Sequence, residues 1–339
     1  MYGALGGVDQ SPGGGNGATL PCENRPSMPE AEPTKLPDTA PDPDTPTREL
    51  VLGGLSGGGG VPAARSDLRH FLPGLEPERH VTDWGRSELV EGLVDRTVYD
   101  FLYHYWFRVE VEGIENVPAE GAALLVSNHA GALPPDGIMI AKAIREEHRH
   151  PRPLHMIVDS PLKGLPGLGM LIAKVGGVPA HPANLHRLLF DERQLALVFP
   201  EGRRGPEKPL KDRYRLRRFG EGSFVEAAMR ARAPIVPVAV LGTEEAQPTF
   251  AHVSLLRRLT GLPRIPVTPT FPLLGPLGLM LYLPAKVRIR FLEPVPTDRL
   301  GDEAWNDPAQ IQTLAGDIRA LIQENLLELV GGRSSVWLG

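Results

Sequence analysis

Short apolar segments of β-strand type alternate with segments of helical periodicity between residues 109 and 291 of this 339-residue chain. The β-type runs are 109–111, 122–127, 155–158, 195–199, 235–241 and 287–291, and helical patterns lie between several of them, notably at 137–147 and 222–232. Strands that alternate with helices form mostly parallel sheets with helices packed on their faces. The alternation therefore predicts one α/β domain with a largely parallel central sheet flanked by helices.

Two further helices are expected at the ends of this region. Between residues 84 and 106, apolar side chains recur at spacings of three and four, which is typical of an amphipathic helix. Near the carboxyl end, Asp307 is suited to cap a helix, Pro308 to its first position and Gly331 to its end. Apolar residues from Ile311 to Leu329 repeat at helical spacing and predict the buried face of this last helix.

The amino-terminal segment has a different composition. Glycine and proline account for 23 of the first 65 residues, and the segment contains neither Phe nor Trp. A segment with so few large apolar side chains cannot bury enough surface to offset the entropy lost on ordering. We therefore expect a disordered, Gly/Pro-rich tail over residues 1–65, a folded domain over 67–332 and a flexible carboxyl terminus over 333–339.

Composition also excludes several classes of protein. The single cysteine, Cys22, rules out a disulfide framework and a cysteine-based zinc site. No segment offers the roughly 18 uninterrupted apolar residues of a spanning helix, and no basic start precedes an apolar run as in a signal peptide. The net charge of −5 gives no overall signal for nucleic acid. These features predict a cytoplasmic protein that is not integral to the membrane.

The strand predicted at 122–127 ends abruptly in polar residues. His129 follows it, and Asp136 lies just ahead of the next predicted helix. In an open α/β sheet, ligands bind just beyond the carboxyl ends of the strands. An Asp that holds one nitrogen of a His imidazole allows the other nitrogen to take a proton from a hydroxyl. The pair is thus a candidate general base and its orienting carboxylate; the alternative is that Asp136 only caps the helix.

The strand predicted at 195–199 ends in a second polar block, Pro200-Glu201-Gly202-Arg203-Arg204-Gly205. Glycine lets the backbone approach a ligand, and arginine can bind an anion with two parallel hydrogen bonds. Eight Lys and Arg residues lie between 203 and 218, against only Glu207 and Asp212. This basic segment is either a solvated loop or a site for a phosphate-bearing substrate, for the phosphates of coenzyme A or for an anionic membrane surface.

Four segments occur together in an order that resembles the glycerolipid acyltransferase family, which includes the 1-acylglycerol-3-phosphate acyltransferases. They lie within residues 114–241 and read Ser127-Asn128-His129 followed by Asp136, Gly176-Gly177-Val178-Pro179, Phe199-Pro200-Glu201-Gly202-Arg203, and Pro234-Ile235-Val236-Pro237-Val238. The prolines of the last segment predict a strand that starts at a sheet edge or a crevice. The family usually has four residues between the His and the Asp, whereas this chain has six, with Pro134 where the usual Asp falls. The family also often carries a charged pair after the Gly-Gly block, whereas Ala180-His181-Pro182-Ala183 follows here.

The resemblance implies an enzyme that moves a fatty acyl group from an acyl-coenzyme A or acyl carrier protein thioester to a hydroxyl of a glycerolipid or lysophospholipid. It implies no cofactor beyond that co-substrate and no metal. His129 and Asp136 would be catalytic. The acceptor's polar head would be bound by Asn128, Glu201, Gly202, Arg203 and Arg204, although Glu201 could instead support the arginines.

A lipid substrate further implies peripheral contact with the inner face of the membrane. Two apolar segments, 161–172 and 270–284, are candidates for that contact, or else pack in the core or line an acyl tunnel. The unusual His–Asp spacing leaves two alternatives open: a catalytically silent acyl- or membrane-binding module and a thioester hydrolase. Nucleic-acid binding is least expected, because only Tyr214 in the basic segment offers stacking.

Overall fold

The computed structural model describes residues 81–129, 135–158, 168–220, 222–253, 265–275, 278, 281–299, 301 and 303–339. The tail predicted at 1–65 and part of the apolar segment at 161–172 lie outside the described residues.

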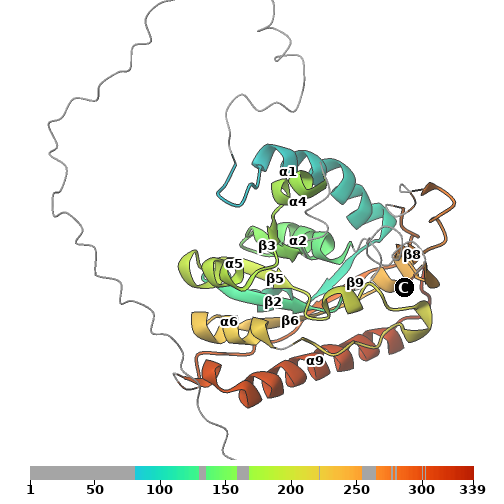
Figure 1. The fold of residues 1–339 in the computed structure, drawn as a ribbon. Coiled ribbons are helices and arrows are strands. Elements are labelled where there is room, and N and C mark those ends of the chain that lie inside the picture. Colours follow the sequence, from blue (N-terminus) through green and yellow to red (C-terminus); the bar gives the residue numbers. More distant parts are fainter. Residues whose placement is uncertain are drawn as a thin grey trace, which may run out of the picture. The chain divides into compact units, whose positions relative to one another are not determined.

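A seven-stranded sheet forms the centre of the domain (Figure 1). Its strand order is β1-β9-β6-β2-β5-β3-β4, and a separate antiparallel pair is made by β7 and β8. All neighbours in the large sheet run parallel except β6 and β9, which confirms the predicted largely parallel α/β architecture. The strands are β1 (Glu110–Glu112), β2 (Ala123–Ser127), β3 (Leu154–Val158), β4 (Gly177–Pro179), β5 (Leu195–Val198), β6 (Ile235–Leu241), β7 (Ala251–Val253), β8 (Ile265–Val267) and β9 (Arg288–Phe291).

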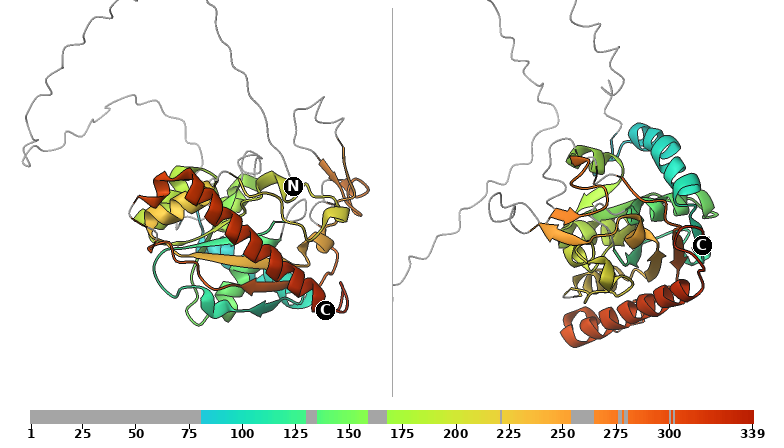
Figure 2. Two further views of the ribbon diagram at one scale, coloured as in Figure 1. Left: turned by 90° about the horizontal axis from the view of Figure 1, so that it is seen from below. Right: turned by 90° about the vertical axis from the view of Figure 1, so that its right-hand side faces the viewer.

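Helices cover both faces of this sheet (Figure 2). The α-helices are α1 (Glu88–Val94), α2 (Asp136–Glu147), α4 (Leu168–Lys174), α5 (Pro182–His186), α6 (Ser223–Ala231), α7 (Thr243–Ala246) and α9 (Pro308–Gly331). Alternate residues of β2 enter two separate cores: Leu124 and Val126 pack with α5, α6 and α9, whereas Ala123 and Leu125 pack with α2. The strand is fully buried because both of its faces are covered, and its side chains alternate as the strand period requires.

The last helix begins and ends where the sequence predicts. The side chain of Asp307 accepts hydrogen bonds from the backbone N–H groups of Ala309 and Gln310, and Pro308 is the first helical residue. Residues 333–339, which the sequence predicts to be flexible, are held by hydrogen bonds in the structure. The backbone N–H of Lys286 donates to the carbonyl of Val336, and the side chain of Arg108 donates to the backbone carbonyl of Trp337.

The amino-terminal helix of the described part runs on beyond α1 through two π-helical segments, Asp95–Tyr99 and Phe101–Trp106. Its predicted apolar stripe divides between two environments. Tyr103 is buried against α2, but several other apolar side chains are at least half exposed, namely Leu89, Leu93, Val98, Phe101 and Tyr105. Among the described residues, no helix combines the length and apolarity needed to cross a membrane.

The fourth family segment forms β6, which lies inside the sheet between β9 and β2 and not at an edge. Pro237, inside this strand, accepts a hydrogen bond from the backbone N–H of Leu292, the first residue after β9. Proline has no backbone N–H to donate, but at Pro237 the ladder between β6 and β9 has already ended. An inner strand therefore tolerates proline at this position.

Candidate active site

His129 and Asp136 meet despite the lengthened spacing between them. His129 is the second residue after β2, and Asp136 is the first residue of α2. The imidazole Nδ1 lies 3.2 Å from Oδ2 of Asp136, whose side chain is fully buried, while the His129 side chain is 18% exposed. A buried carboxylate on one nitrogen and access from outside to the ring are the arrangement that a general base needs. The loop at 130–134 lies outside the described residues.

The imidazole of His129 also stacks on the ring of Phe199, with a centroid separation of 4.0 Å and an interplanar angle of 23°. Phe199 directly follows β5, and its ring also packs against Gly137 in the first turn of α2. A side-chain carbon at position 137 would lie 3.6 Å from that ring and 3.0 Å from Sδ of Met156. Phe199 therefore fixes the plane of the imidazole, and its π face favours a positive charge on that ring. In the sequence, Phe199 ends an apolar strand and begins the third family segment, but neither pattern predicts its stacking on His129.

Asn128 is fully buried and extends the pairing of β2 by means of its side chain. Its Nδ2 donates to the carbonyl of Val240 at 2.8 Å, and its Oδ1 accepts from the N–H of the same residue at 2.8 Å. The amide thus occupies the place of a backbone unit beside β6, just where the chain turns out of the sheet toward His129. The structure places this predicted substrate-binding residue inside the sheet layer.

Glu201 connects the two polar blocks. Its carboxylate accepts hydrogen bonds from the backbone N–H of His129 at 3.1 Å and from that of Arg217 at 2.7 Å. Nζ of Lys208 lies 3.4 Å from Oε2, the oxygen that accepts from Arg217. The Glu201 side chain has no exposed surface. Such a charge is stabilised only when it is paired and hydrogen-bonded. The contacts hold the backbone of the candidate base, whereas the sequence left open only a supporting role toward the arginines.

Two glycines of this block have distinct requirements. Gly202 adopts a left-handed φ of 54°, which side chains rarely adopt. Gly205 packs directly under the candidate base: a side-chain carbon there would lie 2.7 Å from the carbonyl oxygen of His129 and 3.0 Å from its Cβ. Arg204 is exposed at the same turn, and the side chain of Arg203 is outside what the structure describes.

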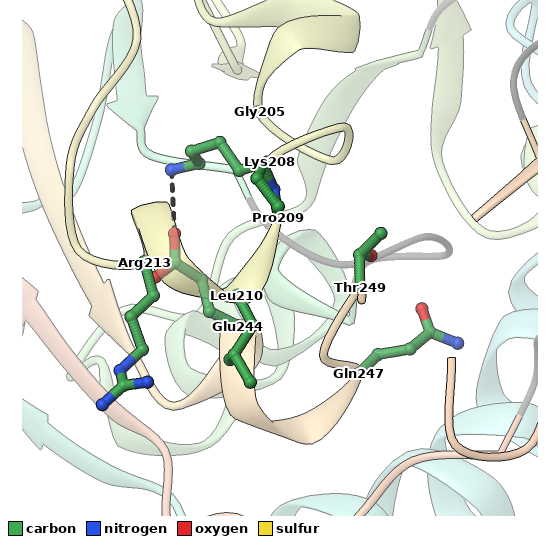
Figure 3. A pocket seen from close by; sticks show the side chains of 8 residues that line it. All are labelled: Gly205, Lys208, Pro209, Leu210, Arg213, Glu244, Gln247 and Thr249. Atoms are coloured by element: carbon green, nitrogen blue, oxygen red, sulfur yellow. Dashed lines mark ion pairs between the residues drawn. The ribbon is translucent and has the colours of Figure 1, made fainter. Parts of the chain in front are cut away.

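Part of the basic segment is internal to the fold. Lys208 is buried, and its Nζ lies 2.8 Å from Oε1 of Glu244, in a small pocket beside Gly205 (Figure 3). Burial raises the pKa of the Glu244 carboxyl, and the neighbouring ammonium of Lys208 opposes that rise. Arg217 is paired with Asp212 at 2.8 Å. In contrast, Arg213 extends away from Lys208 in Figure 3 and is exposed.

A possible metal-binding arrangement occurs on the amino-terminal helix and α2, where Asp100, His104 and Glu146 bring their ligand atoms together. The ammonium of Lys142 already lies 2.9 Å from Asp100 and 2.5 Å from Glu146. The ammonium group of Lys142 thus neutralises the carboxylates of this cluster. Neither His129 nor Asp136 belongs to the cluster.

Known proteins are similar to this chain in sequence and in fold. The family model described as Acyltransferase matches residues 108–241. Uncharacterized proteins from Mycobacterium tuberculosis and Mycobacterium leprae are each 42% identical over 279 residues, covering 82% of this chain and 76% and 75% of theirs. A Gallus gallus protein named "DGAT1/2-independent enzyme synthesizing storage lipids" is 29% identical over 217 residues, 63% of this chain and 59% of its own.

Among solved structures, the 1-acyl-sn-glycerophosphate acyltransferase PlsC from Thermotoga maritima matches with a TM-score of 0.47 and 20% identity, over 73% of this chain and 80% of that one. The fold and the paired His and Asp at the carboxyl end of a parallel strand define the class, an α/β enzyme. The chain belongs to the acyltransferase family, which confirms the resemblance carried by its motifs.

Proposed function

We propose that this acyltransferase moves a fatty acyl group from an acyl-coenzyme A or acyl carrier protein thioester to a hydroxyl of a glycerolipid or lysophospholipid. The observation that carries the proposal is the 3.2 Å contact between Nδ1 of His129 and the buried carboxylate of Asp136. The name of the Gallus gallus relative, which refers to storage-lipid synthesis, supports a lipid acceptor.

In the proposed reaction, Nε2 of His129 removes the proton of the acceptor hydroxyl while the hydroxyl oxygen attacks the thioester carbonyl. Asp136 holds the tautomer and stabilises the imidazolium that forms. The tetrahedral intermediate then expels the thiolate, which takes the proton from His129 and leaves as the free thiol. Assistance by a general base of this kind contributes about 10²–10⁴-fold to the rate. This route uses no metal and no covalent acyl-enzyme.

The remaining predicted residues divide into two roles. Asn128 and Glu201 contact the backbone around the candidate base, and we assign them to positioning His129. Gly202 and Arg204 are exposed at the turn after β5, and we assign them, with Arg203, to the polar head of the acceptor. An arginine there binds a phosphate with parallel hydrogen bonds when the acceptor carries one.

The test is acyl transfer by the purified full chain, with labelled acyl-coenzyme A and a panel of lysophospholipids, glycerol phosphates and diacylglycerol, followed by lipid separation. His129→Ala and Asp136→Asn are expected to lose at least about 10²-fold in rate while retaining a native unfolding transition. His150→Ala, at an exposed position, is the matched control. Wild-type turnover by the His129 variant would reject the base assignment. Free fatty acid formed without acceptor would indicate the hydrolase instead, and binding without consumption would indicate the silent module.

We further propose peripheral association with the inner, cytoplasmic face of a membrane. The apolar side chains exposed on the amino-terminal helix, Leu89, Leu93, Val98, Phe101 and Tyr105, support it, because an exposed apolar helix face inserts into the boundary between headgroups and acyl chains. Flotation with anionic and neutral vesicles at low and high salt tests this. The double variant Leu93→Glu/Phe101→Glu is expected to remain unbound, and Leu327→Glu, at an exposed position on α9, to bind as wild type. Equal flotation of the two variants would contradict the assignment.

A further inference from the structure

A groove of about 370 Å³ runs between α9 and the end of the basic segment. Arg218 and Phe219 form one wall, and the middle of α9, including Gln312, Gly316 and Arg319, forms the other. We call it the α9 groove. It is separate from the small pocket of Lys208 and Glu244, and none of its lining residues has a role in the reaction proposed above.

Neither arginine of the groove has an ion-pair partner among the described residues, unlike Lys208 and Arg217 of the basic segment. Lys208 is paired with Glu244, and Arg217 with Asp212. In the part of the chain that the structure describes, no carboxylate lies within ion-pair distance of Arg218 or of Arg319. Two unpaired guanidinium groups that line one groove favour an anionic occupant, because each offers a planar fork of donors that matches phosphate oxygens.

The wall that carries Arg218 is tied to α9 in advance of any ligand. Gln323 of α9 accepts from the backbone N–H of Leu216 at 2.8 Å and donates to the carbonyl of Tyr214 at 2.7 Å. Arg319 itself donates to the carbonyl of Leu216 at 3.5 Å. A ligand therefore enters a groove whose backbone walls are already fixed, so that binding orders side chains and not the backbone.

The floor of the groove is open at Gly316. A side-chain carbon at this position would have no atom within 4 Å, although glycine inside a helix costs about 1 kcal/mol relative to alanine. Nothing in the packing of α9 therefore requires glycine there. Its effect is to leave space between the two arginines and the helix backbone.

The groove lies beside the candidate active site. Arg217, the residue before Arg218, donates its backbone N–H to Glu201, and Glu201 accepts from the backbone N–H of His129. The N–H of Gly220 donates to the carbonyl of Pro200 at 3.2 Å. One glutamate side chain thus connects the segment that forms the wall of the groove to the backbone of the candidate base.

We propose that the α9 groove binds a phosphate monoester of a substrate through Arg218 and Arg319, with the amide of Gln312 as a further donor. The inference rests on the proposed acyl transfer, in which two substrates can carry such a group: the acyl donor, through the 3′-phosphate of coenzyme A, and a phosphorylated acceptor. The shared chemistry is a phosphate dianion, and the source is decided by experiment.

The test is calorimetric binding of two probes, adenosine 3′,5′-bisphosphate and glycerol 3-phosphate, to the full chain at low salt. Arg319→Ala and Arg218→Ala are each expected to weaken binding of one probe about 10-fold, since a hydrogen bond to a charged group carries that much affinity. Arg319→Lys should recover part of the loss. Gly316→Leu should block the groove while strengthening the helix, so its loss of binding cannot come from unfolding. Arg149→Ala, an exposed arginine after α2, is the matched control.

If the groove variants weaken binding of the bisphosphate alone, the groove binds the acyl donor. If they weaken binding of glycerol 3-phosphate alone, the groove binds the acceptor. Kinetics give an independent readout: KM for the assigned substrate should rise about 10-fold in Arg319→Ala, with kcat nearly unchanged. Absence of binding of both probes to the wild type, or binding that Arg204→Ala abolishes and the groove variants leave intact, overturns the proposal. A wild type that binds a probe but transfers no acyl group instead contradicts the proposed function and leaves the groove assignment standing.

Discussion

Replacing Glu201 with glutamine tests whether this residue supports the candidate base or contacts substrate. Glutamine keeps the shape of the side chain, but its amide N–H₂ must face either the N–H of His129 or that of Arg217, so one of the two hydrogen bonds is lost. A hydrogen bond to a buried charge contributes about 1.5–3 kcal/mol. Lys208 keeps Glu244 at 2.8 Å and is not left unpaired. We therefore expect the free energy of unfolding to fall by about 2–3 kcal/mol.

The same change should displace the backbone of His129 and lower kcat for acyl transfer, by about 10²-fold for a shift near 1 Å, with a smaller effect on KM for the acceptor. Urea unfolding and steady-state kinetics measure the two quantities on one preparation. Glu226→Gln is the control, because that glutamate pairs with Arg230 at the surface of α6, and such a pair contributes only about 0.5 kcal/mol. An unchanged unfolding free energy together with a raised acceptor KM and normal kcat would refute the supporting role.

Three other changes are expected to have defined effects. Gly205→Ala should lower the acyl-transfer rate and destabilise the fold by about 1–3 kcal/mol, because the added carbon would lie 2.7 Å from the carbonyl of His129; a wild-type rate would contradict this. Burial lowers the pKa of His155 to about 4, so the unfolded chain takes up a proton below pH 6.5 that the folded chain refuses. Stability should therefore fall by up to about 3 kcal/mol between pH 6.5 and 4, and urea unfolding of His155→Leu should show a flatter dependence in this window. Asp307→Ala should cost about 1 kcal/mol through the lost cap of α9, measured as a lowered Tm.

The elements that depend on local patterns were predictable from the sequence. Fully buried strands such as β2 and β5 appear as apolar runs, and the cap at Asp307 is a local signal, so their positions agree with the structure to within a residue or two. The three-residue strands β4, β7 and β8 were not predicted, because so short a run carries little periodicity; β1, equally short, was found only through Val109 and Val111. The pairing of β6 with β9 joins segments about fifty residues apart, which no local pattern reveals.

The candidate site likewise has residues that local patterns predict and contacts that they do not. His129 and Asp136 could be found because polar residues follow an apolar strand and precede a helix. The contacts that hold them could not, since each joins distant segments: Asn128 to Val240, Glu201 to Arg217 and Phe199 to the imidazole. The sequence placed Lys208 in a segment that was either a solvated loop or an anion site, whereas lysines are seldom buried and only its tertiary partner Glu244 explains its burial.

The contacts that fix His129 and Asp136 come from the sheet, from Glu201 and from α2, and none of them involves residues 130–134. The number of residues in that interval therefore does not by itself set the distance between the two side chains. Inserting or deleting a residue within 131–134 should be tolerated far better than any change at either anchored end. A search that demands a fixed number of residues between the His and the Asp would overlook chains built this way, whereas one that requires the preceding strand and the following helix would find them.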